Sequence, residues 1–155
     1  MDTGLLSALD EAIIGFRSAT QRSAYARWIL NGLGFDGGVA SLRALRVVER
    51  LSTDEGTPSI RSIATELGVE HSTASRLVDG LVKGGLLQKK ACGEDKRQAR
   101  LSLTEQGRSV LDEATARRRQ IVREATEGWS EQDMDTFTTL LVRFNAGFNE
   151  RFARP

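Results

Sequence analysis

The sequence predicts a mainly α-helical chain that carries one small β-hairpin. Apolar residues recur at steps of three and four over most of the 155 residues, which is the spacing of helices that bury one face. Alternation of apolar and polar residues is found in one short stretch beside a charged turn, as in a half-buried strand. A composition of 39% hydrophobic and 28% charged residues is that of a globular chain able to bury a core.

The first helix is expected over about residues 4–31, and a second over about residues 39–51. Four glycines between positions 32 and 38 separate the two, because glycine favours turns over helix interiors. A turn at Asp54-Glu55-Gly56 follows the second helix. The residues whose spacing defines the first helix are Leu5, Leu9, Ile13, Phe16, Tyr25, Trp28 and Ile29.

Two short helices with a tight turn between them come next. The first has apolar residues from Ile60 to Leu67 and ends at Gly68, and the second ends at Gly84-Gly85. This arrangement is typical of a helix-turn-helix, whose second helix enters the major groove of DNA. The far side of that second helix is small and polar with one arginine, which can hold guanine through two hydrogen bonds. It comprises His71, Ser72, Ser75, Arg76 and Asp79.

The hairpin is expected to pair residues 86–91 with residues 99–103. Its tip, residues 91–98, would carry Lys96 and Arg97 into solvent. The stretch from Lys83 to Arg100 holds six basic and two acidic residues, although the net charge of the whole chain is only +1. Such local positive charge is typical of a surface that binds phosphates, while a solvated loop is the alternative.

Two further helices are predicted after the hairpin. Thr104 is expected to cap the first, which continues to Gly128, and Ser130 to cap the last. An apolar stripe along the last helix exceeds what the preceding module needs for its own core, which favours packing against a partner helix over packing within one chain. The stripe consists of Met134, Phe137, Leu141, Phe144 and Phe148, with Leu140 and Phe152 beside them.

A specific signature lies across the hairpin tip and the second strand. Asp95-Lys96-Arg97 is followed by Leu101-Ser102-Leu103-Thr104 and Gly107, which resembles the D-x-R…LT-x-x-G pattern of the MarR family of bacterial transcription regulators. The resemblance continues upstream and, with the order of the helices, covers nearly the whole chain. The upstream matches are Ser75-Arg76-Leu77-Val78-Asp79, Leu81-Val82 and Gly85-Leu86.

The resemblance implies a winged helix-turn-helix fold in an obligate homodimer whose first and last helices interleave. It divides one compact chain into an N-terminal dimerisation helix and loop (1–37), a DNA-binding region (38–104) and C-terminal dimerisation helices (105–155). The recognition helices would occupy successive major grooves of a pseudo-palindromic operator in double-stranded DNA, with the wings over flanking minor grooves. The expected dimer contacts include Leu9, Ile13, Phe137, Leu141, Phe144 and Phe148.

Matched by position, Arg97 corresponds to the wing arginine that reaches the minor groove, and Asp95 to the acid that orients it. Ser75 and Arg76 correspond to base or phosphate contacts, although Arg76 could instead pair with Asp79 or Glu66. Glu70 stands where a serine or aspartate cap is common, and Gly80 costs the helix up to ~1 kcal/mol relative to alanine. The expected DNA-binding set is His71, Ser72, Thr73, Ser75, Arg76, Asp95, Lys96 and Arg97.

Two residue groups are candidates for sensing a signal. Tyr25 and Trp28 either line an effector pocket between the dimer and DNA-binding regions or simply pack there. Cys92 lies among Lys89, Lys90 and Lys96 in the sequence, and cationic neighbours favour the thiolate that oxidants attack. It is therefore either a redox switch or a passive hairpin cysteine.

These observations predict a homodimeric, sequence-specific DNA-binding repressor that is released by a small molecule or by oxidation at Cys92. The alternative is a winged-helix protein–protein interaction module without specific DNA binding. An enzyme is not expected, because the chain lacks a phosphate-binding glycine motif and its single histidine completes no Ser/His/Asp set. One cysteine and one histidine cannot supply a structural zinc set, so no metal or cofactor is expected. With neither a membrane span nor a signal peptide, a cytoplasmic location is expected.

Overall fold

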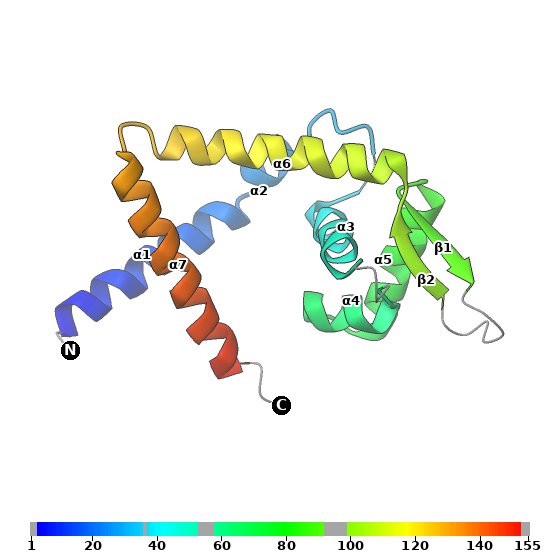
Figure 1. The fold of residues 1–155 in the computed structure, drawn as a ribbon, viewed down its shortest axis with the longest axis horizontal. Helices are drawn as coiled ribbons and strands as arrows, with labels where there is room; N and C mark the ends of the chain where they lie inside the picture. Colours follow the sequence, from blue (N-terminus) through cyan, green and yellow to red (C-terminus); the bar gives the residue numbers. More distant parts are fainter. Residues whose placement is uncertain (1–2, 36, 53–57, 92–98, 153–155) are drawn as a thin grey trace. The chain divides into compact units, whose positions relative to one another are not determined.

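The protein has a mainly α-helical fold with one antiparallel hairpin, as the sequence predicts (Figure 1). The computed structural model describes residues 3–35, 37–52, 58–91 and 99–152. The chain divides within α6 into two compact units, residues 1–117 and residues 118–155. None of the helices within the described ranges is both long and apolar enough to cross a membrane. The elements are α1 (Thr3–Gln21), α2 (Ser23–Leu30), α3 (Val39–Leu51), α4 (Ile60–Leu67), α5 (His71–Lys83), β1 (Leu87–Ala91), β2 (Ala99–Leu103), α6 (Glu105–Ala125) and α7 (Glu131–Phe152).

The prediction of one continuous helix over residues 4–31 is wrong, because the chain breaks between α1 and α2. Arg22 is extended, with φ −64° and ψ 139°. The hydroxyl of Thr20 donates to the carbonyl oxygens of Phe16 and Arg17, at 3.1 and 3.0 Å, and such local bonding competes with regular helix near a terminus. No strongly apolar side chain lies between Phe16 and Tyr25, so no buried face spans the break. The apolar spacing on either side therefore belongs to two helices.

The core of the first unit lies among α3, α4, α5 and the hairpin. These elements share one apolar interior because each turns one face inward, and α3 packs against α4, α5 and β2. Burying each large aliphatic side chain contributes about 1.5–3 kcal/mol. The fully buried side chains include Leu42, Leu45, Val48, Ile63, Val78, Leu86, Leu87, Leu101 and Leu111.

The turn between α4 and α5 follows the predicted helix-turn-helix geometry. Ser59 caps α4 in a reciprocal pair with Ser62, and Gly68 ends the helix at φ +65°, a value that glycine adopts without strain. The N–H of Val69 then donates to the carbonyl oxygen of Ala64 at 3.0 Å. At the start of α5, the side chain of Glu70 makes no capping hydrogen bond, so α5 begins without the usual side-chain cap.

The hairpin joins α5 to α6 through a network of hydrogen bonds centred on Thr104. Strands β1 and β2 pair with Leu87 opposite Leu103 and Lys89 opposite Leu101. Thr104 Oγ1 accepts from the N–H of Gly107 at 3.0 Å, which confirms the predicted cap, and donates to the carbonyl oxygen of Gly85 at 2.6 Å. One hydroxyl thus fixes the start of α6 against the residues that leave α5.

The predicted cap of α7 is also confirmed. Ser130 Oγ accepts from the N–H of Asp133 at 3.1 Å, and the Asp133 carboxylate accepts from the Ser130 hydroxyl at 2.6 Å and from its N–H at 3.0 Å. The two hydrogen bonds that the carboxylate accepts lower the pKa of Asp133 below its ordinary value of 3.8, and the bond from the Ser130 hydroxyl has the larger effect. The carboxylate therefore remains ionised at neutral pH. Its negative charge also interacts favourably with the positive N-terminal end of the α7 dipole.

Two glycines are expected to respond oppositely to alanine. A Cβ on Gly107 would overlap the carbonyl oxygen of Leu86 and lie 2.9 Å from its carbonyl carbon, so Gly107→Ala should destabilise the protein by about 1–3 kcal/mol. A Cβ on Gly80, within α5, would meet nothing within 4 Å, so Gly80→Ala should stabilise it by up to about 1 kcal/mol. Denaturant unfolding measures both changes. Equal stability of the two variants would contradict the close contact at Gly107.

Candidate nucleic-acid interface

The candidate interface is the exposed side of α5, the second helix of the helix-turn-helix. Ala74, Val78 and Leu81 are buried on its inner side. Since side chains three, four and seven residues apart share one face of a helix, this burial leaves the opposite side of α5 in solvent. The exposed residues of α5 are His71, Ser72, Thr73, Arg76, Asp79, Gly80 and Lys83.

Four of the predicted DNA-binding residues are exposed on α5, and three lie outside the described residues. His71, Ser72, Thr73 and Arg76 are exposed, whereas Ser75 is only half-buried. The remaining predicted contacts, Asp95, Lys96 and Arg97, lie outside the described residues, and so does Cys92. The DNA-binding roles of all eight residues, and the role of Cys92, stay predictions from the sequence.

Lys83 is a basic residue of this surface that the sequence interpretation did not include. It follows Arg76 by seven residues, and Ser72 precedes Arg76 by four, so the three side chains share one stripe of α5. The spacing was available in the sequence. Lys83 lies in the last turn of α5, beside the C-terminal end of the helix, which is a favourable place for a cation.

The two acids that could have held Arg76 are both engaged with other partners. Glu66 pairs with Arg50 of α3, and Asp79 Oδ1 lies 2.6 Å from the Nζ of Lys89 on β1. Within the described ranges, no ion pair joins Arg76 to either acid. The structure therefore favours a guanidinium that is available to a ligand over the self-paired alternative.

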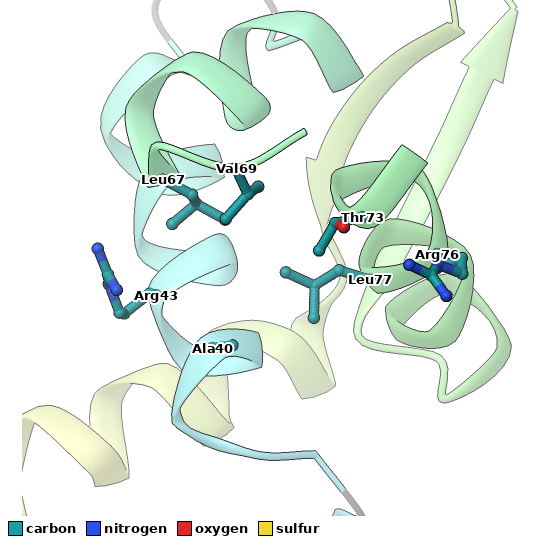
Figure 2. A pocket seen from close by; sticks show the side chains of 7 residues that line it. All are labelled: Ala40, Arg43, Leu67, Val69, Thr73, Arg76 and Leu77. Atoms are coloured by element: carbon teal, nitrogen blue, oxygen red, sulfur yellow. The ribbon is translucent and has the colours of Figure 1, made fainter. Parts of the chain in front are cut away.

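Two shallow cavities flank α5, and Arg76 and Leu77 line both of them. The first has a volume of about 400 Å³ and lies between α3, the turn after α4, and α5. Figure 2 shows apolar side chains of Leu67, Val69 and Leu77 across its middle, with the guanidinium groups of Arg43 and Arg76 on opposite sides. The second, of about 500 Å³, lies beside the last turns of α5 and includes Phe35, Ser41 and Lys83.

The predicted effector residues Tyr25 and Trp28 line neither of these cavities. Tyr25 is half-buried and Trp28 is 39% exposed. Arg117 of α6 donates to the carbonyl oxygens of Trp28 and Ile29, at 3.3 and 3.5 Å, and so caps the end of α2 with a cation. A pocket at Tyr25 and Trp28 stays a prediction.

In the part of the chain that the structure describes, no cluster of histidine, cysteine or acidic residues could hold a metal ion.

Comparisons with known proteins find relatives in sequence and in fold. Residues 38–98, which include α3, the helix-turn-helix and β1, match the sequence model of the MarR family. A MarR family protein from Bacillus stearothermophilus is similar in fold, with a TM-score of 0.80 and 17% identity over 96% of this chain and 99% of that one. Streptococcus pneumoniae FabT, solved in complex with DNA, is also similar, with a TM-score of 0.74 and 14% identity. The match covers 94% of this chain and 98% of that one.

A third similar structure is that of Bordetella bronchiseptica BpsR, described with a mechanism for regulation of its DNA binding by 6-hydroxynicotinic acid. Its TM-score is 0.59 at 20% identity, over 87% of this chain and 98% of that one. At these identities the three structures show a shared fold. They extend the similarity beyond residues 38–98 to nearly the whole chain.

Proposed function

This chain belongs to the MarR family of winged helix-turn-helix regulators, and we propose on that premise that it is a homodimeric, sequence-specific DNA-binding repressor. The observation that carries the proposal is the exposed stripe of Ser72, Arg76 and Lys83 on α5, directly opposite its buried face. Small polar residues allow a helix to approach base edges closely, and arginine can hold guanine in the major groove. FabT shares the fold and was solved in complex with DNA, which supports DNA binding by this chain.

The local charge supports DNA over a protein partner. Arg76 and Lys83 lie on the exposed side of α5, and Arg43 lies beside the first cavity. Each cation that neutralises a phosphate releases bound counterions from DNA, so such a surface gives affinity that falls with salt. A protein–protein module would not need this concentration of basic side chains around one helix.

Homodimerisation is supported by two helices that leave their apolar faces uncovered. Neither α1 nor α7 contains a buried residue. Large exposed apolar faces are rare on monomeric proteins and mark sites of association. On α1 they include Leu5, Leu9 and Ile13, at 70%, 50% and 36% exposure, and on α7 Phe137, Leu141, Phe144 and Phe148, at 49%, 43%, 38% and 54%.

We further propose that a signal releases the repressor from DNA, either a small-molecule effector or oxidation at Cys92. The regulation of BpsR by 6-hydroxynicotinic acid supports the first route. For that route, the candidate residues are Tyr25 and Trp28 together with the two cavities beside α5. A ligand lowers affinity only if it prefers the protein conformation that binds DNA less well, or if it occupies the same surface.

Arg76→Ala tests the DNA interface. Sequencing the genomic fragments that the purified protein retains gives an operator, which is then titrated at several salt concentrations. The substitution should weaken binding by roughly 1–3 kcal/mol and relax discrimination at one base pair. The matched control is Arg27→Ala, because Arg27 lies on α2 and donates to Ser23 Oγ at 3.1 Å. Absent or salt-insensitive binding by the unmodified protein would favour the protein-interaction module instead.

Phe144→Asp tests the dimer. A carboxylate within an apolar seam loses its hydration, so the substitution should cost several kcal/mol of association and shift the protein toward monomer in sedimentation equilibrium. Thr139→Asp is the control, because Thr139 lies on the opposite side of α7 from Phe137, Phe144 and Phe148. A Phe144→Asp protein that sediments like the control would remove α7 from the interface.

A further inference from the structure

We propose that Lys89 acts as a positioning residue that holds Asp79 away from Arg76 and Lys83, so that both cations of α5 are free to bind DNA. This inference rests on the proposed DNA-binding function and adds a role for two residues of its interface. The juxtaposition that carries it is the ion pair between Asp79 Oδ1 and Lys89 Nζ, 2.6 Å apart.

Asp79 has three cations within potential reach. It follows Arg76 by three residues and precedes Lys83 by four, and side chains at these two spacings on a helix form ion pairs readily. Its third neighbour, Lys89, lies ten residues away in sequence but on β1, which packs beside α5. Within the described residues, the acid pairs with Lys89, and neither Arg76 nor Lys83 has an ion-pair partner.

The pair is poorly suited to a purely structural role. The side chains of Lys89 and Asp79 are 36% and 53% exposed. Ion pairs this open to water contribute little to folding, because solvent screens them and two long side chains lose freedom. The pair matters instead for DNA binding, because Asp79 is an acid on the surface expected to face phosphates.

Removing Lys89 would release Asp79 to its neighbours on α5. The freed carboxylate would pair with Arg76 or Lys83 and would repel phosphate if left unpaired. Lys89→Gln should therefore weaken operator binding roughly fivefold to tenfold and reduce the salt dependence by about one released counterion. Asp79→Asn should leave affinity unchanged or slightly higher, because Arg76 and Lys83 stay free.

The decisive variant is the double substitution Asp79→Asn with Lys89→Gln. It has lost the same lysine as the single Lys89→Gln protein but also the acid that would capture Arg76. Operator affinity and salt slope should return to within about threefold of the unmodified protein. Titration of all four proteins with one operator fragment completes the cycle, and thermal unfolding of each checks that folding is unchanged.

The outcomes separate the inference from the proposed function. If the double variant binds as weakly as Lys89→Gln alone, Lys89 contacts DNA directly and the positioning role is overturned, while the proposed function stands. If Lys89→Gln binds as tightly as the unmodified protein with the same salt slope, the inference is likewise wrong. A lack of salt-dependent DNA binding by the unmodified protein would overturn both proposals.

Discussion

The packing of Ala74, Val78 and Leu81 into the core sets the rotation of α5 about its own axis. Because these three side chains occupy one face, Ser72, Arg76 and Lys83 must lie on the other. A slip of one residue in this packing would turn Ser75 and Asp79, or Thr73 and Gly80, toward the core in place of the buried side chains. The chemistry offered to a partner is therefore a consequence of the apolar core beneath the helix.

The hairpin is held to the same core at its base and to α5 along its side. Thr104 links Gly85, in the turn after α5, to the start of α6, and Gly107 admits the backbone of Leu86 where no side chain would fit. The Asp79–Lys89 pair then joins the outer surfaces of α5 and β1. In the function we propose, this construction would present the helix and the two strands to DNA as a unit.

Local patterns in the sequence predicted much of the fold. Apolar spacing gave α3 and the helix-turn-helix, alternation gave the hairpin, and the caps at Thr104 and Ser130 were evident from residue type. Contacts between distant segments were not predictable in this way. Asp79 could have paired with any of several cations, and only the packing of β1 beside α5 selects Lys89. The break at Arg22 was missed because two separate helices continued one apolar spacing.

The proposed repressor function depends most on contact between the exposed side of α5 and DNA. NMR spectra of the protein, free and bound to its retained operator fragment, test this contact directly. We predict that the largest changes in backbone amide signals fall within residues 71–83, and that the side-chain Nε–H signal of Arg76 shifts on binding. If the signals of α5 were unchanged while those of other helices shifted, the protein would bind DNA through a different surface and the account would be contradicted.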